Sequence, residues 1–173
     1  GLCGTMSVGK TTLVNALKKT KQFKDYNFAT ERSQHLMSLG IPLNTDSTLK
    51  GQTVFLAERC GELMQDNIIT DRTILDVMAF TMNAKSIPHQ DKEAFETYAS
   101  EFVREYDYIF YISPYGLEIE DNGVRETDEH YRDLIDFTIT TLIKRHGHKA
   151  GTIEKISGST EERIQQILNV TKL

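Results

Sequence analysis

Short apolar runs alternate along the chain with longer stretches in which apolar residues recur every three or four positions. The short runs predict buried strands at residues 1–3, 26–30, 67–70, 108–112 and 152–156. The longer stretches predict helices at residues 12–19, 31–39, 47–65, 75–80, 91–105 and 127–146, and a final helix that starts with a capping box at 159–162. Strands that alternate with helices indicate an α/β protein whose parallel sheet is covered by helices on both faces.

The segment between the first strand and the first helix fits the phosphate-loop pattern G-x-x-x-x-G-K-[ST] at every fixed position. The predicted phosphate-binding residues are Gly4, Thr5, Met6, Ser7, Val8, Gly9, Lys10, Thr11 and, next in the helix, Thr12. In such a loop the backbone N–H groups surround the phosphates, and the N-terminus of the helix favours their charge. We expect Lys10 to reach the β- and γ-phosphates and the Thr11 hydroxyl to bind Mg²⁺. The chain is therefore predicted to have the P-loop NTPase fold, an α/β three-layer sandwich.

Functional residue types follow four of the five predicted strands directly. The phosphate loop follows the first strand, Glu31 the second, Asp71 and Arg72 the third, and Ser157 and Gly158 the fifth. Ligands of open α/β sheets bind beyond the carboxyl ends of the strands, so these residues are predicted to meet at one active site. Ser157 and Gly158 are expected near the base of the nucleotide. Backbone contacts there do not decide between ATP and GTP.

The pair Asp71 and Arg72 indicates the type of reaction. Asp71 ends a short apolar strand, as a Mg²⁺-associated acid does in phosphate-loop enzymes. A hydrolase usually has a second acid beside it to activate water, whereas the neighbour here is Arg72. This pair suits a transferase in which Asp71 handles the metal or the acceptor hydroxyl and Arg72 grips a phosphate. The other interpretation is a helix-capping Asp beside a surface Arg.

Three further charged residues are candidates for the reaction. Glu31 is placed to take a proton from an acceptor hydroxyl or to hold Mg²⁺ through water; otherwise it is a first-turn acid that complements the helix dipole. Arg125 and Arg132 lie in or next to a polar stretch that is predicted to form a lid, at residues 114–132. Arginines on a closing lid would contact the transferring phosphates. The alternative for both is a solvated loop with ordinary surface charges.

Composition sets limits on the class of protein. A length of 173 residues fits a single domain that spans 1–173, and the net charge of −5 argues against a general nucleic-acid-coating protein. No apolar stretch is long enough to span a membrane, and no signal-peptide pattern is present, so we expect a cytoplasmic protein without a membrane partner. Cys3 and Cys60 have no metal-ligand spacing. A dimer is compatible with the sequence.

Nearly the whole chain resembles the AAA-type ATP-binding domains that include the nicotinamide riboside kinase domain of NadR proteins and related phage nucleotide kinases. The resemblance rests on residues 4–11, 30–32, 71–76, 79–80, 121–125, 157–158 and 161–163. It implies a five-stranded parallel sheet in the order 2-3-1-4-5, ATP as donor, Mg²⁺, and an acceptor site between Glu31, Asp71, Arg72 and the lid. The riboside kinases tend to have Leu-Asp-Thr after the third strand. Asp71-Arg72-Thr73 is closer to the deoxynucleoside and nucleotide kinases.

The sequence therefore predicts a kinase that transfers the γ-phosphoryl group of ATP to a nucleoside, a nucleotide or a modified base. Lys10 and the loop would stabilise charge, Thr11 and Asp71 would hold Mg²⁺, Glu31 or Asp71 would orient the acceptor, and Arg125 would close over it. Nicotinamide riboside and a hydroxymethylated base within DNA stay open as acceptors. A GTPase switch would show Asp-x-x-Gly and Asn-Lys-x-Asp, which are absent from the sequence. A mechanical ATPase is disfavoured by Arg72 and by the short length.

Overall fold

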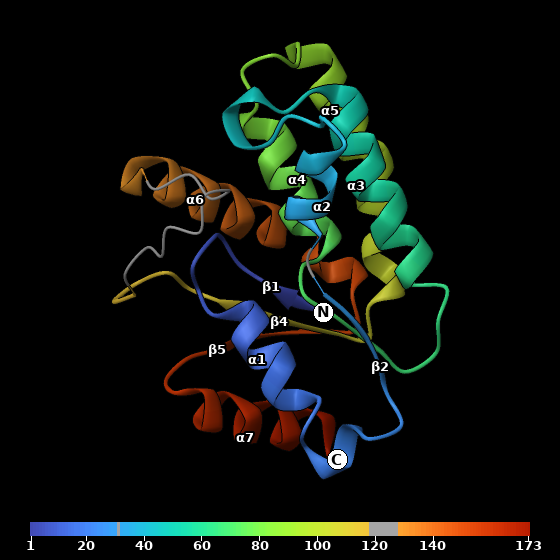
Figure 1. Cartoon of the computed structure of the whole chain (residues 1–173), viewed down its shortest axis with the longest axis vertical. Coiled ribbons are helices and arrows are strands. Elements are labelled where there is room, and N and C mark those ends of the chain that lie inside the picture. Colours follow the sequence, from blue (N-terminus) through green and yellow to red (C-terminus); the bar gives the residue numbers. More distant parts are fainter. Residues whose placement is uncertain (31, 118–127) are drawn as a thin grey trace.

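Parallel strands form the centre of the molecule in two groups (Figure 1). The computed structural model describes residues 1–30, 32–117 and 128–173. β1 (Leu2–Cys3), β4 (Tyr108–Ile112) and β5 (Thr152–Ile156) pair in the order β1-β4-β5, and β2 (Asn27–Ala29) pairs with β3 (Ile68–Thr70). These pairings agree with the predicted order 2-3-1-4-5 except that no β3–β1 ladder is assigned in the described residues. A continuous five-stranded sheet therefore stays a prediction.

Seven α-helices in the described residues correspond to the seven predicted ones. They are α1 (Lys10–Leu17), α2 (Ser33–Ser38), α3 (Leu49–Glu62), α4 (Ile74–Asn83), α5 (His89–Ala99), α6 (Glu129–His146) and α7 (Thr160–Thr171). Short 3₁₀ turns occur at Lys21–Phe23, Asn44–Asp46, Ser100–Glu105 and Gly147–Lys149. The helix predicted at 91–105 is thus α5 followed by a 3₁₀ turn. The capping box that was predicted to start the last helix is confirmed at Ser159 and Glu162.

Alternate residues of β4 face two separate hydrophobic cores. Ile109 and Tyr111 pack with side chains of α4 and α6, whereas Phe110 and Ile112 pack with side chains of α1 and α7. This period of two is the sequence pattern of a strand buried on both faces. Figure 1 shows the result, with α1 and α7 on one side of the β1-β4-β5 sheet and α4 and α6 on the other. Because the strands are parallel, their carboxyl ends lie on the same side of the molecule.

Helix α4 is the most deeply buried helix among the described parts of the chain. Its residues from Ile74 to Thr81 are all buried, and α3, α5 and α6 pack around it. A helix that is apolar around its whole circumference belongs in a core. The segment that leads into α4 carries Asp71 and Arg72, so the central helix fixes where these two residues lie. Nowhere in the described ranges is a helix both long and apolar enough to cross a membrane.

Candidate functional site

The phosphate-loop motif forms a tight turn between β1 and α1. Gly4, Ser7 and Gly9 have positive φ angles of 151°, 58° and 82°. Helix α1 begins at Lys10, two residues earlier than predicted, and its first free N–H groups therefore point into the loop. A loop that ends on a helix N-terminus attracts anions through the helix dipole. The backbone thus has the shape that phosphate binding by this motif would require.

Gly4 is required by its surroundings as well as by its φ angle. A Cβ atom at this position would lie 2.5 Å from the carbonyl oxygen of Ile112. We expect Gly4→Ala to lower the free energy of unfolding by about 3 kcal/mol, because it adds this backbone clash to the strain of a left-handed conformation. Gly40 is a matched control, since its φ is +79° and nothing lies within 4 Å of its Cβ position. Gly40→Ala should cost only about 1 kcal/mol. Equal losses in chemical denaturation would contradict the expectation.

The Lys10 side chain is buried inside the loop. Its ammonium donates hydrogen bonds to the carbonyl oxygens of Gly4 and Thr5, the latter at 2.7 Å, and only 6% of the side chain is exposed. Burial lowers the pKa of the Lys10 ammonium from its usual value, and the nearby Arg72 guanidinium lowers it further. The Asp76 carboxylate, 4.0 Å away, favours the charged form. The Lys10 side chain is therefore held inside the loop between Gly4 and Lys10.

The two residues predicted to bind a metal are brought together. The Thr11 hydroxyl donates a 2.6 Å hydrogen bond to Oδ2 of Asp71, whose side chain is 1% exposed. Both are oxygen ligands of the kind that Mg²⁺ prefers. Within the described ranges, no three His, Cys, Asp or Glu side chains gather at a point where they could hold a metal. The pair therefore fits a Mg²⁺ ion that takes its remaining ligands from nucleotide phosphates and water.

Arg72 adopts a backbone conformation that is unusual for a residue with a side chain. Its φ angle is 144°, and its guanidinium lies 5.1 Å from the centroid of the Phe80 ring. Asp71 on one side is fixed by a 2.9 Å hydrogen bond from its N–H to the Ala29 carbonyl. Thr73 on the other side caps α4 together with Asp76. The turn after β3 is thus tied down at both ends and directs Arg72 over an aromatic face.

Three contacts that local sequence patterns did not reveal fix the loop to distant helices. The Gly4 N–H donates to Asp76 of α4 at 3.0 Å, and the Thr5 hydroxyl donates to the Arg132 carbonyl of α6 at 3.3 Å. Arg163 of α7 donates to the Val8 carbonyl at 2.8 Å. The T-x-x-D pattern at 73–76 is typical of the capping box that Thr73 and Asp76 form, but it does not indicate the contact of Asp76 with Gly4. Each contact makes the shape of the loop depend on a different helix.

Arg163→Met is expected to lower the free energy of unfolding by about 1–2 kcal/mol, because the Val8 carbonyl would lose its donor in a buried setting. For a chain of this size the melting temperature should fall by roughly 5 °C. Thermal unfolding of Arg163→Met should be compared with that of Arg104→Met, since Arg104 is 58% exposed and its contacts in the described part of the chain are with Glu101, three residues away. That control should change stability by less than about 0.5 kcal/mol. An unchanged melting temperature for Arg163→Met would show that the Val8 contact is dispensable.

Only the two ends of the predicted lid segment lie in the described residues. Arg132 is 9% exposed and donates from Nη1 to the Leu117 carbonyl at 2.7 Å, so it joins the two ends of the predicted lid segment. Arg125 lies outside the described residues, as does Glu31. Arg32, next to Glu31 in the sequence, forms an ion pair with Glu58 of α3 at 3.2 Å. A role for Arg125, Arg132 or Glu31 at the nucleotide stays a prediction.

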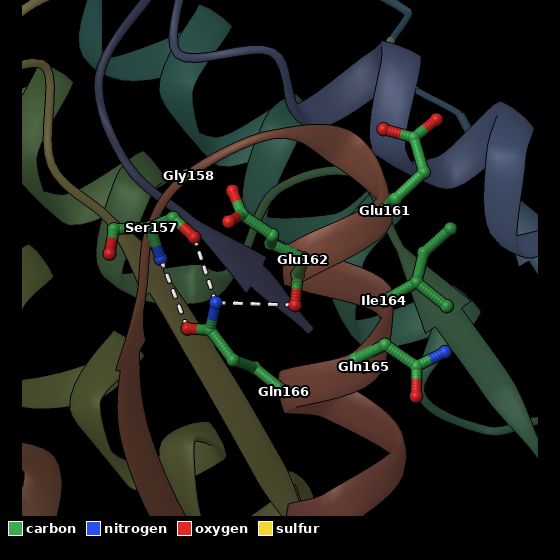
Figure 2. A pocket seen from close by; sticks show the side chains of 7 residues that line it. All are labelled: Ser157, Gly158, Glu161, Glu162, Ile164, Gln165 and Gln166. Carbon is green, nitrogen blue, oxygen red and sulfur yellow. Dashed lines mark hydrogen bonds between the residues drawn. The ribbon is translucent and has the colours of Figure 1, made fainter.

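The turn after β5 is closed by Gln166 of α7 (Figure 2). The Ser157 N–H donates to the Gln166 carboxamide oxygen at 3.2 Å, and the Gln166 amide donates back to the Ser157 carbonyl at 2.8 Å and to the Glu162 carbonyl at 3.2 Å. The backbone groups of Ser157 that were expected to read a base are thus already bonded within the chain. Gly158 has a φ of 92° beside this contact. Base recognition by Ser157 and Gly158 therefore stays a prediction.

A comparison with protein-family models identifies the relationship that this geometry suggests. A family model described as an AAA domain matches residues 2–163, from β1 to the first turn of α7. The chain belongs to this AAA domain family. The match includes the phosphate loop, the Asp71 segment and Arg163, which are the parts of this AAA domain that the structure brings together.

Solved structures share the fold of this AAA domain at low sequence identity. Deoxyadenosine kinase from M. mycoides with dCTP bound is 18% identical with a TM-score of 0.68, and the match covers 99% of this chain and 97% of that one. The same enzyme with products dCMP and dCDP bound is 18% identical with a TM-score of 0.67, over 99% and 96%. YorR protein from Bacillus subtilis in complex with phosphorylated GDP is 14% identical with a TM-score of 0.61, over 99% and 94%. A search of curated protein sequences finds no match. The AAA domain therefore has the α/β fold of these structures.

Proposed function

We propose that this AAA domain is an ATP- and Mg²⁺-dependent kinase that phosphorylates a nucleoside or nucleotide. The observation that carries the proposal is the 2.6 Å contact between Thr11 and Asp71 beside the buried Lys10. It brings the end of β3 to the phosphate loop, where an acceptor would meet the donor. Arg72 follows Asp71 in place of a second acid, which favours transfer to an acceptor over transfer to water. The fold relatives support this class, because one is a deoxyadenosine kinase with deoxycytidine nucleotides bound.

In the proposed reaction an acceptor oxygen attacks the γ-phosphorus in line. The new acceptor O–P bond forms as the bond from the γ-phosphorus to the β,γ-bridging oxygen breaks, and ADP leaves. Lys10 and the loop N–H groups stabilise the charge that develops on the phosphate oxygens. Asp71 or Glu31 orients a hydroxyl acceptor and receives its proton, which then passes to solvent. Mg²⁺, when bound at Thr11 and Asp71, would neutralise charge on the β- and γ-phosphate oxygens.

The acceptor that we favour is a deoxynucleoside or a nucleotide. The segment Asp71-Arg72-Thr73 supports it, since the nicotinamide riboside kinases tend to have Leu-Asp-Thr at this place. Bound deoxycytidine nucleotides in one fold relative agree with the same class. Nicotinamide riboside and a hydroxymethylated base in DNA are the alternative acceptors and belong in the same experiment.

A phosphate-transfer screen tests the proposal. The protein is incubated with γ-labelled ATP, Mg²⁺ and separate acceptors: nucleosides, deoxynucleosides, nucleoside monophosphates, nicotinamide riboside, plain DNA and hydroxymethyl-base DNA. Parallel reactions contain γ-labelled GTP, or EDTA in place of Mg²⁺. Label on one free nucleoside or nucleotide, dependent on Mg²⁺, would support the proposed function. Labelled free phosphate with no labelled acceptor would overturn it in favour of an ATPase.

A further inference from the structure

The Asp76 carboxylate contacts two segments of the proposed active site. One is the phosphate loop, on the donor side, and the other is the segment that carries Asp71, on the acceptor side. It lies in the first turn of α4 and is fully buried. Its Oδ1 accepts the Gly4 N–H at 3.0 Å, and its Oδ2 accepts both the N–H and the hydroxyl of Thr73 at 2.7 Å. The Lys10 ammonium lies 4.0 Å from Oδ1. One oxygen thus contacts the phosphate loop, and the other contacts the segment that carries Asp71.

Helix capping alone does not account for this arrangement. The capping box uses only Oδ2 with Thr73, three residues away, whereas Oδ1 reaches 72 residues back along the chain to Gly4. Caps are effective at exposed helix ends, and burying a carboxylate carries a desolvation cost that needs further partners. The Gly4 N–H and the Lys10 ammonium are those partners. The cost of burial is therefore offset by contacts with the phosphate loop.

The two segments that Asp76 joins have little freedom of their own. Gly4 packs against β4, because even a Cβ atom there would lie 2.5 Å from the Ile112 carbonyl oxygen. Arg72, between Asp71 and Thr73, has a φ of 144°. An L-residue keeps such a conformation only where its surroundings determine it strongly. Asp76 supplies that constraint from the Thr73 side, and the Thr11–Asp71 hydrogen bond supplies it from the other.

We propose that Asp76 is a positioning residue that sets the distance between the phosphate loop and the Asp71–Arg72 turn. This inference rests on the proposed kinase function, since it concerns how donor and acceptor groups are aligned. Asp76 itself does not touch the reacting atoms; it acts through Gly4 on one side and Thr73 on the other. Displacement by about 1 Å of groups that align reactants lowers a rate by up to about a hundredfold. Loss of the constraint should therefore slow transfer more than it weakens nucleotide binding.

Asp76→Asn tests the proposal with little change in volume. Its retained oxygen can still accept from Gly4, but its amide group then faces the Thr73 N–H, and that hydrogen bond is lost. We expect kcat to fall about tenfold to a hundredfold, with the KM for ATP changed by less than about threefold. Thr73→Val removes the hydrogen bond from the Thr73 hydroxyl to Asp76 and should lower kcat by a smaller factor, without a change in KM. Thr73→Ser retains that hydroxyl and should keep the wild-type kcat. Asp136→Asn is the matched control, because it makes the same change at a half-buried carboxylate that accepts from the Tyr111 hydroxyl and not from the phosphate loop.

A double-mutant cycle separates positioning from a general loss of stability. If the role of Asp76 is to position Asp71, Asp76→Asn should lower kcat by a much smaller factor in an Asp71→Asn background than in the wild type. Equal losses in both backgrounds, an unchanged kcat, or a rise in KM alone would overturn the inference. If Asp76→Asn does not fold, the comparison of Thr73→Val with Thr73→Ser decides. A wild-type protein that transfers no label to any acceptor would instead refute the proposed function and the inference with it.

Discussion

Lys10→Ala is expected to lower kcat for phosphoryl transfer by about a thousandfold, equivalent to roughly 4 kcal/mol of transition-state stabilisation. The Lys10 ammonium donates hydrogen bonds to the carbonyl oxygens of Gly4 and Thr5. These bonds hold the cation inside the phosphate loop. Charge develops on the γ-phosphate oxygens during transfer, so the loss should appear mainly in kcat. Single-turnover transfer from γ-labelled ATP to the acceptor found in the screen measures it.

The stability of Lys10→Ala should differ little from that of the wild type. Removal of the ammonium leaves two carbonyl oxygens without their donor, but it also removes the cost of burying a charge, and these effects oppose each other. Lys19→Ala is the matched control, because Lys19 is exposed just after the other end of α1. It should retain wild-type kcat. If Lys10→Ala retained more than about a tenth of the wild-type kcat, a central role for this cation would be refuted.

Asp71→Asn is expected to lower kcat by about a hundredfold or more and to raise the Mg²⁺ concentration needed for half-maximal activity. The substitution keeps the shape of the side chain but removes the negative charge next to the Thr11 hydroxyl. A neutral amide is a weaker ligand of Mg²⁺ than a carboxylate, and it is a poor base for the proton of the acceptor hydroxyl. The measurement is kcat as a function of Mg²⁺ concentration for both proteins.

Asp66→Asn provides the control for Asp71→Asn. Asp66 is exposed just before β3, whereas Asp71 is buried just after it, so the same chemical change is made at the two ends of one strand. Asp66→Asn should leave both kcat and the Mg²⁺ dependence unchanged. A normal Mg²⁺ dependence in Asp71→Asn would rule out Asp71 as a metal ligand and leave it the role of orienting the acceptor.

Local patterns in the sequence predict the elements of this fold well, but they misplace some boundaries. Helix α1 was predicted from Thr12, because its apolar period begins at Leu13; it starts at Lys10 because the loop geometry sets its first turn. The helix predicted to run on to Glu105 ends at Ala99. Beyond it, buried Val103 and Tyr106 are three residues apart, which suits a 3₁₀ turn, where residues i and i+3 lie on one side. Periodicity over so few residues does not separate the two helix types.

Candidate site residues could be predicted where a strand, a loop or a motif positions them. The phosphate motif and the position of Asp71 at a strand end predicted that Thr11 and Asp71 share a Mg²⁺ site; the hydrogen bond between them brings the two side chains together, and their metal role stays a prediction. The contact of Arg163 with Val8 spans 155 residues, and nothing in the local sequence of α7 indicates its partner. The ion pair of Arg32 with Glu58 on α3 likewise depends on how α3 packs, which the local sequence does not indicate. Contacts that depend on packing between distant elements need the structure.

The three contacts that hold the phosphate loop also have a consequence for folding. They span 72, 127 and 155 residues, and their partners lie on α4, α6 and α7. Contacts of such high sequence separation form late, because the intervening chain must first be ordered. The phosphate loop therefore takes its final shape only after α4, α6 and α7 have packed against it. Nucleotide would then stabilise only the completely folded chain, by about 2.7 kcal/mol at a concentration one hundred times its Kd, and would not rescue partly folded intermediates.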